Sequence, residues 1–369
     1  MRLNLRNSTL RNLGKETMKI MSEIKYCDFD KPLVLESGER LSRFHLAYQT
    51  FGTLNVEKSN VIWIVHALTA NSDPLDWWPG VVGNDQVINP NEHFIICANA
   101  LGSHYGSTNA LDINPNTGEK YYHDFPLITN RDIVDGFIHL QNEMNLPKIK
   151  LLIGASLGGQ QAVEWSIKAP ETIENLILIA TNAKHSPYGI AFNESQRLAI
   201  QADHSWTERS DDAGKRGLLA ARSIALLSYR TATGYDLTQQ DISEDLENYR
   251  VTSYQRYQGE KLIKRFDAFS YWTLSKAMDS HNVGRGRGGL DLALSVIKSK
   301  TTVIGIDTDV LFPISEQKLL TKKIKNARYE ELSSKLGHDG FLTESAKVSS
   351  IISSVLEKKP ILRTIEKAS

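Results

Sequence analysis

The chain has 369 residues, enough for one enlarged domain or for two, and its 43 basic and 43 acidic side chains give a formal net charge of zero. A chain without net charge is not expected to have nucleic acid or an anionic membrane as its main partner. It has no apolar stretch near the ~20 residues that cross a bilayer. Its two cysteines, Cys27 and Cys97, form neither a metal-type spacing nor a disulfide framework, which predicts a cytoplasmic protein.

The segment Met1–Lys19 is basic but has no apolar core, so it lacks the pattern of a secretory signal. It could be an organellar presequence, a disordered tail, or sequence upstream of a true start at Met18. We expect residues 1–22 to form a disordered tail. The basic residues of the segment are Arg2, Arg6, Arg11, Lys15 and Lys19.

Short apolar runs in the first third of the chain predict strands that precede one amphipathic helix. Leu33–Glu36 and Phe44–Thr50 are expected to pair as antiparallel strands through the turn-forming residues between them. Val61–Val65 and His93–Ala98 have the composition of buried strands. In Arg131–Met144 apolar residues recur at helical spacing, so that segment is expected to be a helix.

The stretch Lys150–Ala162 has the pattern of a strand, a tight turn and a helix around one serine. An apolar run precedes the motif Gly-Ala-Ser-Leu-Gly at residues 154–158, and a helical pattern follows it. Gly-x-Ser-x-Gly in this setting is typical of a nucleophile elbow, a strained turn that lifts a serine hydroxyl above a sheet edge. A Cβ at either glycine would collide with the neighbouring strand or helix. The alternative is a glycine-rich helix start that Ser156 caps.

Three more strands are expected after this turn, at Leu176–Ala180, Thr301–Ile306 and Ala327–Leu332. Apolar strands that alternate with amphipathic helices indicate an α/β fold, with a mostly parallel sheet covered by helices on both faces. We expect residues 23–183 and 300–369 to form this core.

Residues 184–299 have a different pattern, because charged and polar residues increase and strand-like runs disappear. Helices are expected at Ala213–Tyr229, Ser243–Gln258 and Phe269–Ser280. We interpret the segment as a helical insertion that forms a lid over the carboxyl edge of the sheet.

A serine nucleophile needs a base, and the base needs an acid that orients it. In folds with a nucleophile elbow, the acid and then the histidine follow the serine along the chain. Asp309 lies in a loop after a predicted strand and is our choice for the acid, with Asp307 as the alternative. His338 has glycines close on either side, in the loop after the last predicted strand, and is the expected base. The predicted catalytic set is therefore Ser156, Asp309 and His338.

Acyl transfer also needs two backbone N–H groups that bind an oxyanion. Leu157, directly after the nucleophile, is expected to supply one of them. The loop after the strand Val61–Val65 should supply the other, and we choose Leu68, to within one residue. His66, in the same loop, could be a second catalytic residue but is expected to shape the loop instead.

A further set of motifs runs in one order from about residue 30 to about residue 350. It comprises His66-Ala67-Leu68-Thr69, Asn99-Ala100-Leu101-Gly102, Ile113-Asn114-Pro115, Thr117-Gly118, Asp124-Phe125-Pro126, Ile128-Thr129, Arg131-Asp132, Gly154–Gly159, Leu218–Tyr229, Gly284-Arg285-Gly286-Arg287-Gly288, Asp309 with Leu311-Phe312-Pro313, and Gly337-His338-Asp339 with Phe341-Leu342. In these motifs the chain resembles the homoserine O-acetyltransferase family, acyltransferases of methionine biosynthesis with the α/β-hydrolase fold.

The resemblance implies a ping-pong reaction in which Ser156 receives an acetyl group from acetyl-CoA and L-homoserine then accepts it. Ser156, Asp309 and His338 match the nucleophile, acid and base of the family. Arg222 and Asp339 match its positions for the carboxylate and the amino group of homoserine. The resemblance implies small-molecule substrates, no metal and no permanently bound cofactor, and a homodimer formed through the lid.

Several alternatives stay open. A succinyl donor or serine as acceptor would use the same scaffold. A hydrolytic esterase or thioesterase would share the triad but would not require Arg222 and Asp339. A non-catalytic binding protein of the same fold is a further alternative, which the complete triad argues against.

The position of Arg222 also supports a binding role. In the helix expected at residues 213–229, it falls between Leu219 and Leu226 on an apolar stripe, where a guanidinium is costly unless an anion meets it. The alternative is an arginine that reaches solvent or pairs with a structural acid.

The chain departs from the family pattern at two places. Residues 109–112 are Asn-Ala-Leu-Asp, where the family usually has Gly-Pro and then small residues, and residue 70 is alanine, where the family usually has glycine. Both places are expected near the mouth of the site, so the identity of the acyl group and of the acceptor stays open.

Gly284–Gly289 matches Gly-x-Gly-x-x-Gly, the pattern of a dinucleotide-binding turn. It follows a predicted helix and not a strand, so we reject a dinucleotide site. Arg285 and Arg287 are expected either to meet the phosphates of coenzyme A or to connect the lid to the core.

Overall fold

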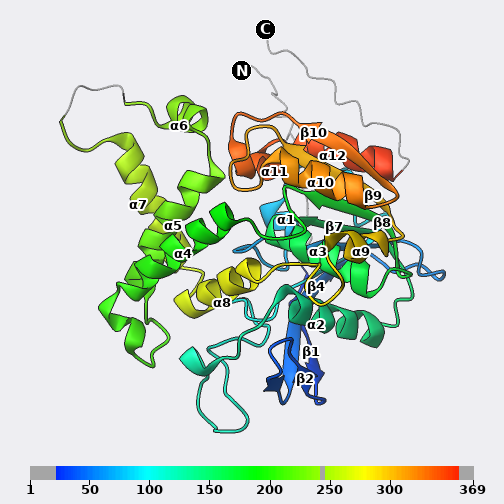
Figure 1. The fold of residues 1–369 in the computed structure, drawn as a ribbon, viewed down its shortest axis with the longest axis horizontal. Helices are drawn as coiled ribbons and strands as arrows, with labels where there is room; N and C mark the ends of the chain where they lie inside the picture. The colour runs from blue at the N-terminus through cyan, green and yellow to red at the C-terminus, as the bar shows by residue number, and fades with distance from the viewer. Residues whose placement is uncertain (1–21, 242–245, 357–369) are drawn as a thin grey trace, which may run out of the picture.

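The structure is a computed structural model that describes residues 22–241 and 246–356 (Figure 1). The tail expected at residues 1–22 lies outside the described residues except for Ser22. No helix in the two described ranges is long and apolar enough to cross a membrane.

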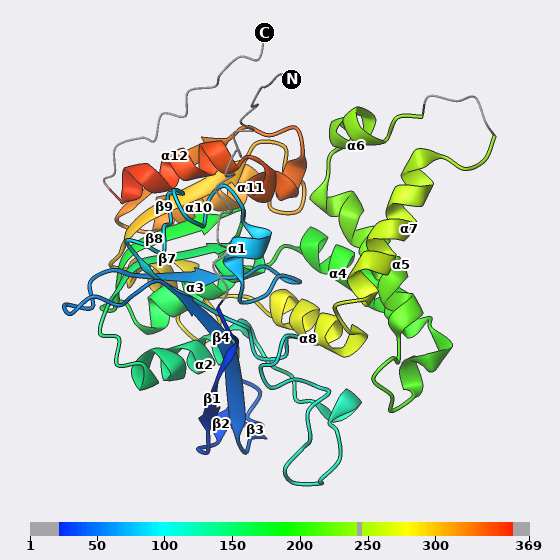
Figure 2. The same ribbon diagram turned by 180° about the vertical axis from the view of Figure 1, so that it is seen from behind.

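An eight-stranded sheet forms the centre of the fold (Figures 1 and 2). Its spatial order is β1-β4-β6-β5-β7-β8-β9-β10, and of these eight strands β4 alone runs against the others. The strands are β1 (Lys25–Phe29), β4 (Phe44–Phe51), β5 (Val61–Val65), β6 (Phe94–Ala98), β7 (Ile149–Ala155), β8 (Ile173–Ile179), β9 (Lys300–Ile306) and β10 (Ala327–Leu332). The mostly parallel sheet predicted from the sequence is confirmed.

Alternate residues of the central strands enter two separate hydrophobic cores. In β5, Trp63 and Val65 pack into one core, whereas Ile62 and Ile64 pack into the other. Every residue of this strand is buried. A strand that is apolar on both faces needs helices on each side of the sheet.

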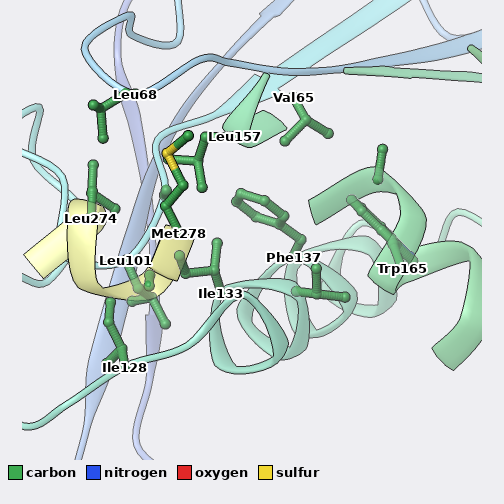
Figure 3. Packing of buried hydrophobic residues seen from close by; sticks show 14 of the residues in the cluster. Val65, Leu68, Leu101, Ile128, Ile133, Phe137, Leu157, Trp165, Leu274 and Met278 are labelled. Carbon is green, nitrogen blue, oxygen red and sulfur yellow. The ribbon is translucent and has the colours of Figure 1, made fainter. Parts of the chain in front are cut away.

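Helices cover both faces of the sheet. One face carries α2 (Asn130–Glu143), α3 (Leu157–Lys168), α9 (Leu290–Ser295) and α10 (Ile314–Lys323); the other carries α1 (Pro74–Trp77), α11 (Gly340–Thr343) and α12 (Ser345–Val355). The ring of Trp165 on α3 lies 4.9 Å from that of Trp63 and 5.7 Å from that of Phe137 on α2. Figure 3 shows Phe137 and Trp165 in this core. Their packing holds α3, and the turn before it, against the sheet.

The prediction that Leu33–Glu36 pairs with Phe44–Thr50 was wrong, because each of the two strands has other partners. β2 (Leu33–Val34) pairs with β3 (Arg40–Leu41), whereas β4 pairs with β1 and β6. The turn is tight, because Leu35 N–H donates to Glu39 O and Gly38 N–H donates to Leu35 O, both at 2.9 Å. Such a turn pairs only the residues directly beside it and leaves the longer β4 for the main sheet.

The elements assigned between β8 and α9 are all helical, and Figures 1 and 2 show α4–α7 as a group beside the sheet. They are α4 (Pro187–Gln201), η2 (His204–Thr207), α5 (Lys215–Tyr229), α6 (Ala232–Gln239), α7 (Arg250–Ile263) and α8 (Ala268–Asp279). The sequence predicts α5, α7 and α8 but not α4 and α6. α7 begins later than expected, because Asn248 has a positive φ of 66° that is incompatible with a helix, and the expected start at Ser243 lies outside the described residues.

This helical segment leaves and rejoins the core at neighbouring points. Val283 N–H donates to Ala183 O at 3.0 Å, and His185 N–H donates to His281 O at 2.9 Å. Two antiparallel stretches therefore connect α4–α8 to the sheet. α5 packs against the short turn η3 (Gly337–Asp339), which follows β10, and a similar turn, η1 (Tyr122–Asp124), precedes α2.

Candidate active site

Ser156 lies at the turn between β7 and α3. Its backbone has φ 57° and ψ −126°, a conformation that is strained for a residue with a side chain. A Cβ on Gly154 would lie 2.3 Å from Gly158 O, and a Cβ on Gly158 would lie 2.3 Å from Val65 O. The close approach predicted at both glycines is confirmed, and the turn has the geometry of a nucleophile elbow.

The hydroxyl of Ser156 is available for reaction. The backbone N–H of this buried residue donates to Ile179 O at 3.0 Å, and its carbonyl accepts from Thr181 Oγ1 at 2.9 Å. Within the described part of the chain its hydroxyl makes no hydrogen bond, to His338 or to any other residue. Hydrogen bonds between catalytic groups are often long before a substrate binds. The backbone bonds hold the serine in place, while its hydroxyl can still donate and accept.

Asp309 and His338 are joined by a short hydrogen bond. They follow β9 and β10, and Oδ2 of Asp309 lies 2.6 Å from Nδ1 of the imidazole. The other carboxylate oxygen of Asp309 accepts the backbone N–H groups of Leu311 and Phe312, at 2.8 and 3.0 Å. An ionised carboxylate only accepts, so Nδ1 carries the proton and Nε2 remains free to accept one. The alternative acid, Asp307, instead accepts a backbone N–H in the loop after β10.

His338 is buried among aromatic rings. Its ring centroid lies 5.3 Å from that of Phe312, 5.6 Å from that of Phe341 and 5.7 Å from that of Tyr229. Burial lowers the pKa of the imidazole, but the charge and hydrogen bond of Asp309 outweigh burial, and nearby negative charge adds to them, so the pKa of His338 is raised. A raised pKa makes the imidazole of His338 a stronger base.

Leu68 and Leu157 each have a backbone N–H without a hydrogen-bond partner among the described residues. Leu157 begins α3, where the first N–H groups of a helix lack internal partners. The loop after β5 lies close to this helix start, because a Cβ on Gly158 would be 2.8 Å from His66 O. Figure 3 shows the side chains of Leu68 and Leu157 in one cluster with Met278. The geometry is therefore compatible with the predicted oxyanion hole.

His66 connects this loop to the segment after β6. Its imidazole is buried, with Nε2 at 3.0 Å from Ala100 N and Nδ1 at 2.8 Å from Ala67 O. The amide of Ala100 can only donate, so Nδ1 carries the ring proton. Burial lowers the pKa of His66 to about 4, so the ring is neutral at pH 7. These contacts agree with the structural role expected for His66.

Arg222 has no carboxylate partner among the described residues, and it makes no hydrogen bond with them. Its Cζ lies 5.5 Å from the ring centroid of Tyr229, on the same helix α5. The ring of Tyr229 also lies near that of His338, at 5.7 Å between ring centroids. A partly buried guanidinium without an anion is costly. Its position, one ring away from the expected base, suits the carboxylate of a ligand.

Asp339 is already paired in the structure. Its Oδ2 accepts a hydrogen bond from Nε of Arg230 at 3.1 Å, and the guanidinium of Arg230 also lies 5.5 Å from the ring of Tyr254. Oδ1 of Asp339 makes no hydrogen bond with the residues that the structure describes. The expected ligand of an amino group thus keeps one free oxygen, and the sequence-based prediction missed its partner Arg230.

A polar chain links the helix after the elbow to α10, the helix that follows the loop of Asp309. Nε2 of Gln160 donates to Oδ1 of Asn182 at 3.0 Å, and Nδ2 of Asn182 donates to Oε2 of Glu316 at 2.9 Å. Burial raises the pKa of Glu316 to about 7; the charge of Asp309 adds to the rise and the Asn182 hydrogen bond opposes it. Glu316 therefore changes its charge near neutral pH.

Arg285 and Arg287 bind acidic side chains of the core. Nη2 of Arg285 lies 2.8 Å from Oε2 of Glu36, and Nη2 of Arg287 lies 2.6 Å from Oε1 of Glu164 on α3. Arg131 bridges the same two acids at 2.9 and 3.0 Å. This network supports the alternative in which the two arginines connect the helical segment to the core.

The two departures from the family pattern lie in ordered loops. Ala70 N–H donates to Ala67 O at 3.0 Å and closes the turn that contains Leu68. Asp112 accepts Asn109 N–H at 2.9 Å and lines a cavity of about 550 Å³. Neither loop contributes to a metal site, since no group of three or more His, Cys, Asp or Glu side chains in the described ranges could hold a metal ion.

The sheet, the elbow and the Asp–His pair are those of the α/β hydrolases, and a family model described as "alpha/beta hydrolase fold" matches residues 60–345. The chain is 48% identical over 338 residues to the homoserine O-acetyltransferase of Cyclobacterium marinum, a match that covers 92% of this chain and 96% of the relative. The chain belongs to the homoserine O-acetyltransferase family.

Solved structures have the same fold, and one of them is a homoserine O-acetyltransferase. The crystal structure of homoserine O-acetyltransferase from Bacillus anthracis is similar with a TM-score of 0.84 and 25% identity, over 92% of this chain and 99% of that one. Esterase E22 has a TM-score of 0.83 at 23% identity, over 91% of this chain and 100% of that one, and it shows the fold alone.

Proposed function

We propose that the chain is a homoserine O-acetyltransferase, which moves an acetyl group from acetyl-CoA to the hydroxyl of L-homoserine in methionine biosynthesis. The proposal rests chiefly on the guanidinium of Arg222, which no described carboxylate neutralises and which lies one ring away from His338. Homoserine has a carboxylate that a guanidinium can bind through two parallel hydrogen bonds. A hydrolase for neutral esters has no need of such a cation.

In the first half-reaction, Nε2 of His338 removes the hydroxyl proton of Ser156 as the oxygen attacks the thioester carbonyl of acetyl-CoA. The backbone N–H groups of Leu157 and Leu68 bind the oxyanion of the tetrahedral intermediate. The carbon–sulfur bond then breaks, the proton passes from His338 to the sulfur, and acetyl-serine remains. Asp309 stabilises the imidazolium that exists between the two proton transfers.

In the second half-reaction, homoserine binds with its carboxylate on Arg222 and its ammonium on the free oxygen of Asp339. Its hydroxyl gives a proton to His338 and attacks the acetyl carbonyl on Ser156. The ester bond to the enzyme breaks, the serine oxygen takes the proton back from His338, and O-acetylhomoserine leaves. Two charged contacts orient the acceptor hydroxyl, which favours it over water because a fixed reactant has a high effective concentration.

We also propose that residues 184–299 act as the lid of a core formed by residues 23–183 and 300–369. Transfer exceeds hydrolysis only when water is kept from the acetyl-serine. α5 supports a lid role, because it carries Arg222 and packs against the turn of His338. The acceptor site then includes groups from both the lid and the core.

The active form is proposed to be a cytoplasmic homodimer that pairs through the lid. Large apolar side chains are exposed on four lid helices, at Leu198, Leu227, Leu237 and Tyr257. A contiguous apolar patch marks an interaction surface, so pairing through the lid would bury these side chains together. Light scattering on the protein as it elutes from a size-exclusion column should give twice the mass of one chain. The mass of a single chain would contradict the dimer.

The substrates are tested by combining each donor with each acceptor. Acetyl-CoA and succinyl-CoA are each incubated with L-homoserine and L-serine, and products are identified by mass spectrometry. We expect the highest kcat/KM for acetyl-CoA with L-homoserine. A preference for succinyl-CoA or for serine would correct the substrate, since a few pocket contacts decide such choices. Free acetate without acyl-homoserine would identify an esterase instead.

A further inference from the structure

The loop at residues 67–70, which we name the oxyanion loop, is contacted by a lid residue outside the predicted site. Arg265 lies between α7 and α8, and its Nη1 donates to Thr69 O at 2.6 Å. The same nitrogen donates to the hydroxyl of Tyr105, in the loop after β6. The guanidinium therefore joins the helical segment to two loops of the core.

Two peptide groups connect this contact to the predicted oxyanion donor. The carbonyl of Thr69 shares a peptide group with the N–H of Ala70, which donates to Ala67 O at 3.0 Å. The carbonyl of Ala67 in turn shares a peptide group with the N–H of Leu68, which no described residue binds. In a trans peptide the C=O and N–H bonds point in opposite directions. A bond that holds Ala67 O therefore also fixes the direction of the Leu68 N–H.

The charge of Arg265 also strengthens the bonds in this series. Arg265 has no carboxylate partner among the described residues, so its charge is not compensated by an ion pair. Hydrogen bonds in series polarise one another, by about 10–30% per bond. A cation on Thr69 O makes the Ala70 N–H a better donor, which in turn makes the Leu68 N–H a better donor. From the core side, the ring of His66 donates to Ala67 O at 2.8 Å.

We propose that Arg265 is a positioning residue of the oxyanion hole, which holds and polarises the oxyanion loop so that the Leu68 N–H meets the developing oxyanion. The lid must then be in place for the oxyanion hole to be complete. This inference rests on the proposed acyl transfer. The competing explanation for an exposed arginine here is that it binds the phosphates of coenzyme A.

The test compares acetyl-CoA with p-nitrophenyl acetate, an acetyl donor without phosphates, in the variant Arg265→Gln. Single-turnover formation of acetyl-Ser156 should slow about tenfold with both donors, less than the 10²- to 10³-fold lost with a whole oxyanion donor. The KM for acetyl-CoA should not change. Arg265→Lys keeps the charge and one donor, so it should recover most of the rate. The carbonyl stretch of the acetyl-enzyme, measured by infrared spectroscopy, should shift to higher frequency in Arg265→Gln because its hydrogen bonds weaken.

Lys264→Gln is the matched control, because Lys264 is adjacent and its exposed side chain makes no hydrogen bond or ion pair with the described residues. It should behave as the unmodified chain. A loss confined to acetyl-CoA with a raised KM would assign Arg265 to phosphate binding and overturn the positioning role, as would unchanged rates with both donors. If the unmodified chain forms no acetyl-Ser156 with either donor, the proposed function fails, and this inference fails with it.

Discussion

Arg230 donates from Nε to Oδ2 of Asp339 at 3.1 Å, across the boundary between α5 and the turn that carries His338. Both side chains are largely shielded from solvent, at 23% and 18% exposure. The bond holds the Asp339 carboxylate in place through Oδ2, while Oδ1 makes no hydrogen bond with the described residues.

Arg230→Gln should raise the KM for homoserine about tenfold, the effect of about 1.4 kcal/mol, because a charge-assisted hydrogen bond that orients Asp339 is lost. The rate of acylation by acetyl-CoA should stay the same, since homoserine takes no part in that step. Steady-state kinetics at varied homoserine will measure this, with Arg256→Gln on the exposed surface of α7 as the control. An unchanged KM for homoserine would show that the pair has no role in binding.

Arg222 is expected to bind the homoserine carboxylate. Arg222→Gln removes a charge-assisted hydrogen bond of about 1.5–3 kcal/mol, so kcat/KM for homoserine should fall about 10- to 100-fold. Arg222→Lys should lose less, because lysine keeps the charge but not the two-pronged geometry. Acetylation of Ser156 without acceptor should proceed normally in both variants. An equal loss in the two half-reactions would contradict a role limited to the acceptor.

The acid of the triad can be tested against its neighbour. Asp309→Asn should reduce kcat by about 10⁴-fold, because an amide no longer fixes the tautomer of His338 or stabilises its charged form. Asp307→Asn should keep kcat within about threefold, since that side chain binds a backbone N–H and not the imidazole. Rapid-quench kinetics on both variants will decide, and the opposite ranking would reverse the assignment.

Glu316 should make the stability of the fold depend on pH. Its folded pKa, about 7, lies above its ordinary value, so the stabilisation that protonation provides is complete below about pH 4 and is lost as pH rises through 7. Glu316→Gln stays neutral and its oxygen can still accept from Asn182. The variant should therefore melt at a higher temperature than the unmodified chain at pH 8 and at a similar temperature at pH 5.

Thermal unfolding followed by circular dichroism at the two pH values measures this difference. Glu260→Gln, on the exposed surface of α7, is the matched control and should not change the pH dependence. If Glu316→Gln melts lower than the unmodified chain at pH 8, the ionised carboxylate stabilises the fold and the account of its burial is wrong.

The three residues of the proposed triad could be located in the sequence because each lies next to a local pattern. Gly154 and Gly158 mark the turn of Ser156, while Asp309 and His338 each lie in the loop after a predicted strand of the parallel sheet. The carboxyl ends of parallel strands lie at one edge, so strand order brings these loops together without knowledge of the packing between helices.

The rest of the site depends on how the helical segment folds over the sheet. Tyr229 lies two helical turns after Arg222, so the sequence alone could have predicted that both lie on one face of α5. The contact of Tyr229 with His338 depends on tertiary packing, which the sequence pattern does not give. No pattern in the sequence distinguishes Arg230 and Arg265 from arginines that lie on the surface. Their partners, Asp339 and the carbonyl of Thr69, are more than a hundred residues away along the chain, so no local pattern identifies them.

The central claim is that Ser156 carries the acetyl group between two substrates. The chain is incubated with acetyl-CoA alone, quenched in acid and digested, and the peptide that contains Ser156 is examined by mass spectrometry before and after addition of L-homoserine. We predict that this peptide gains one acetyl group and then loses it as O-acetyl-L-homoserine forms, and that Ser156→Ala gains none. An acetyl-homoserine product formed without any acetylated Ser156, or formed by Ser156→Ala, would contradict the account.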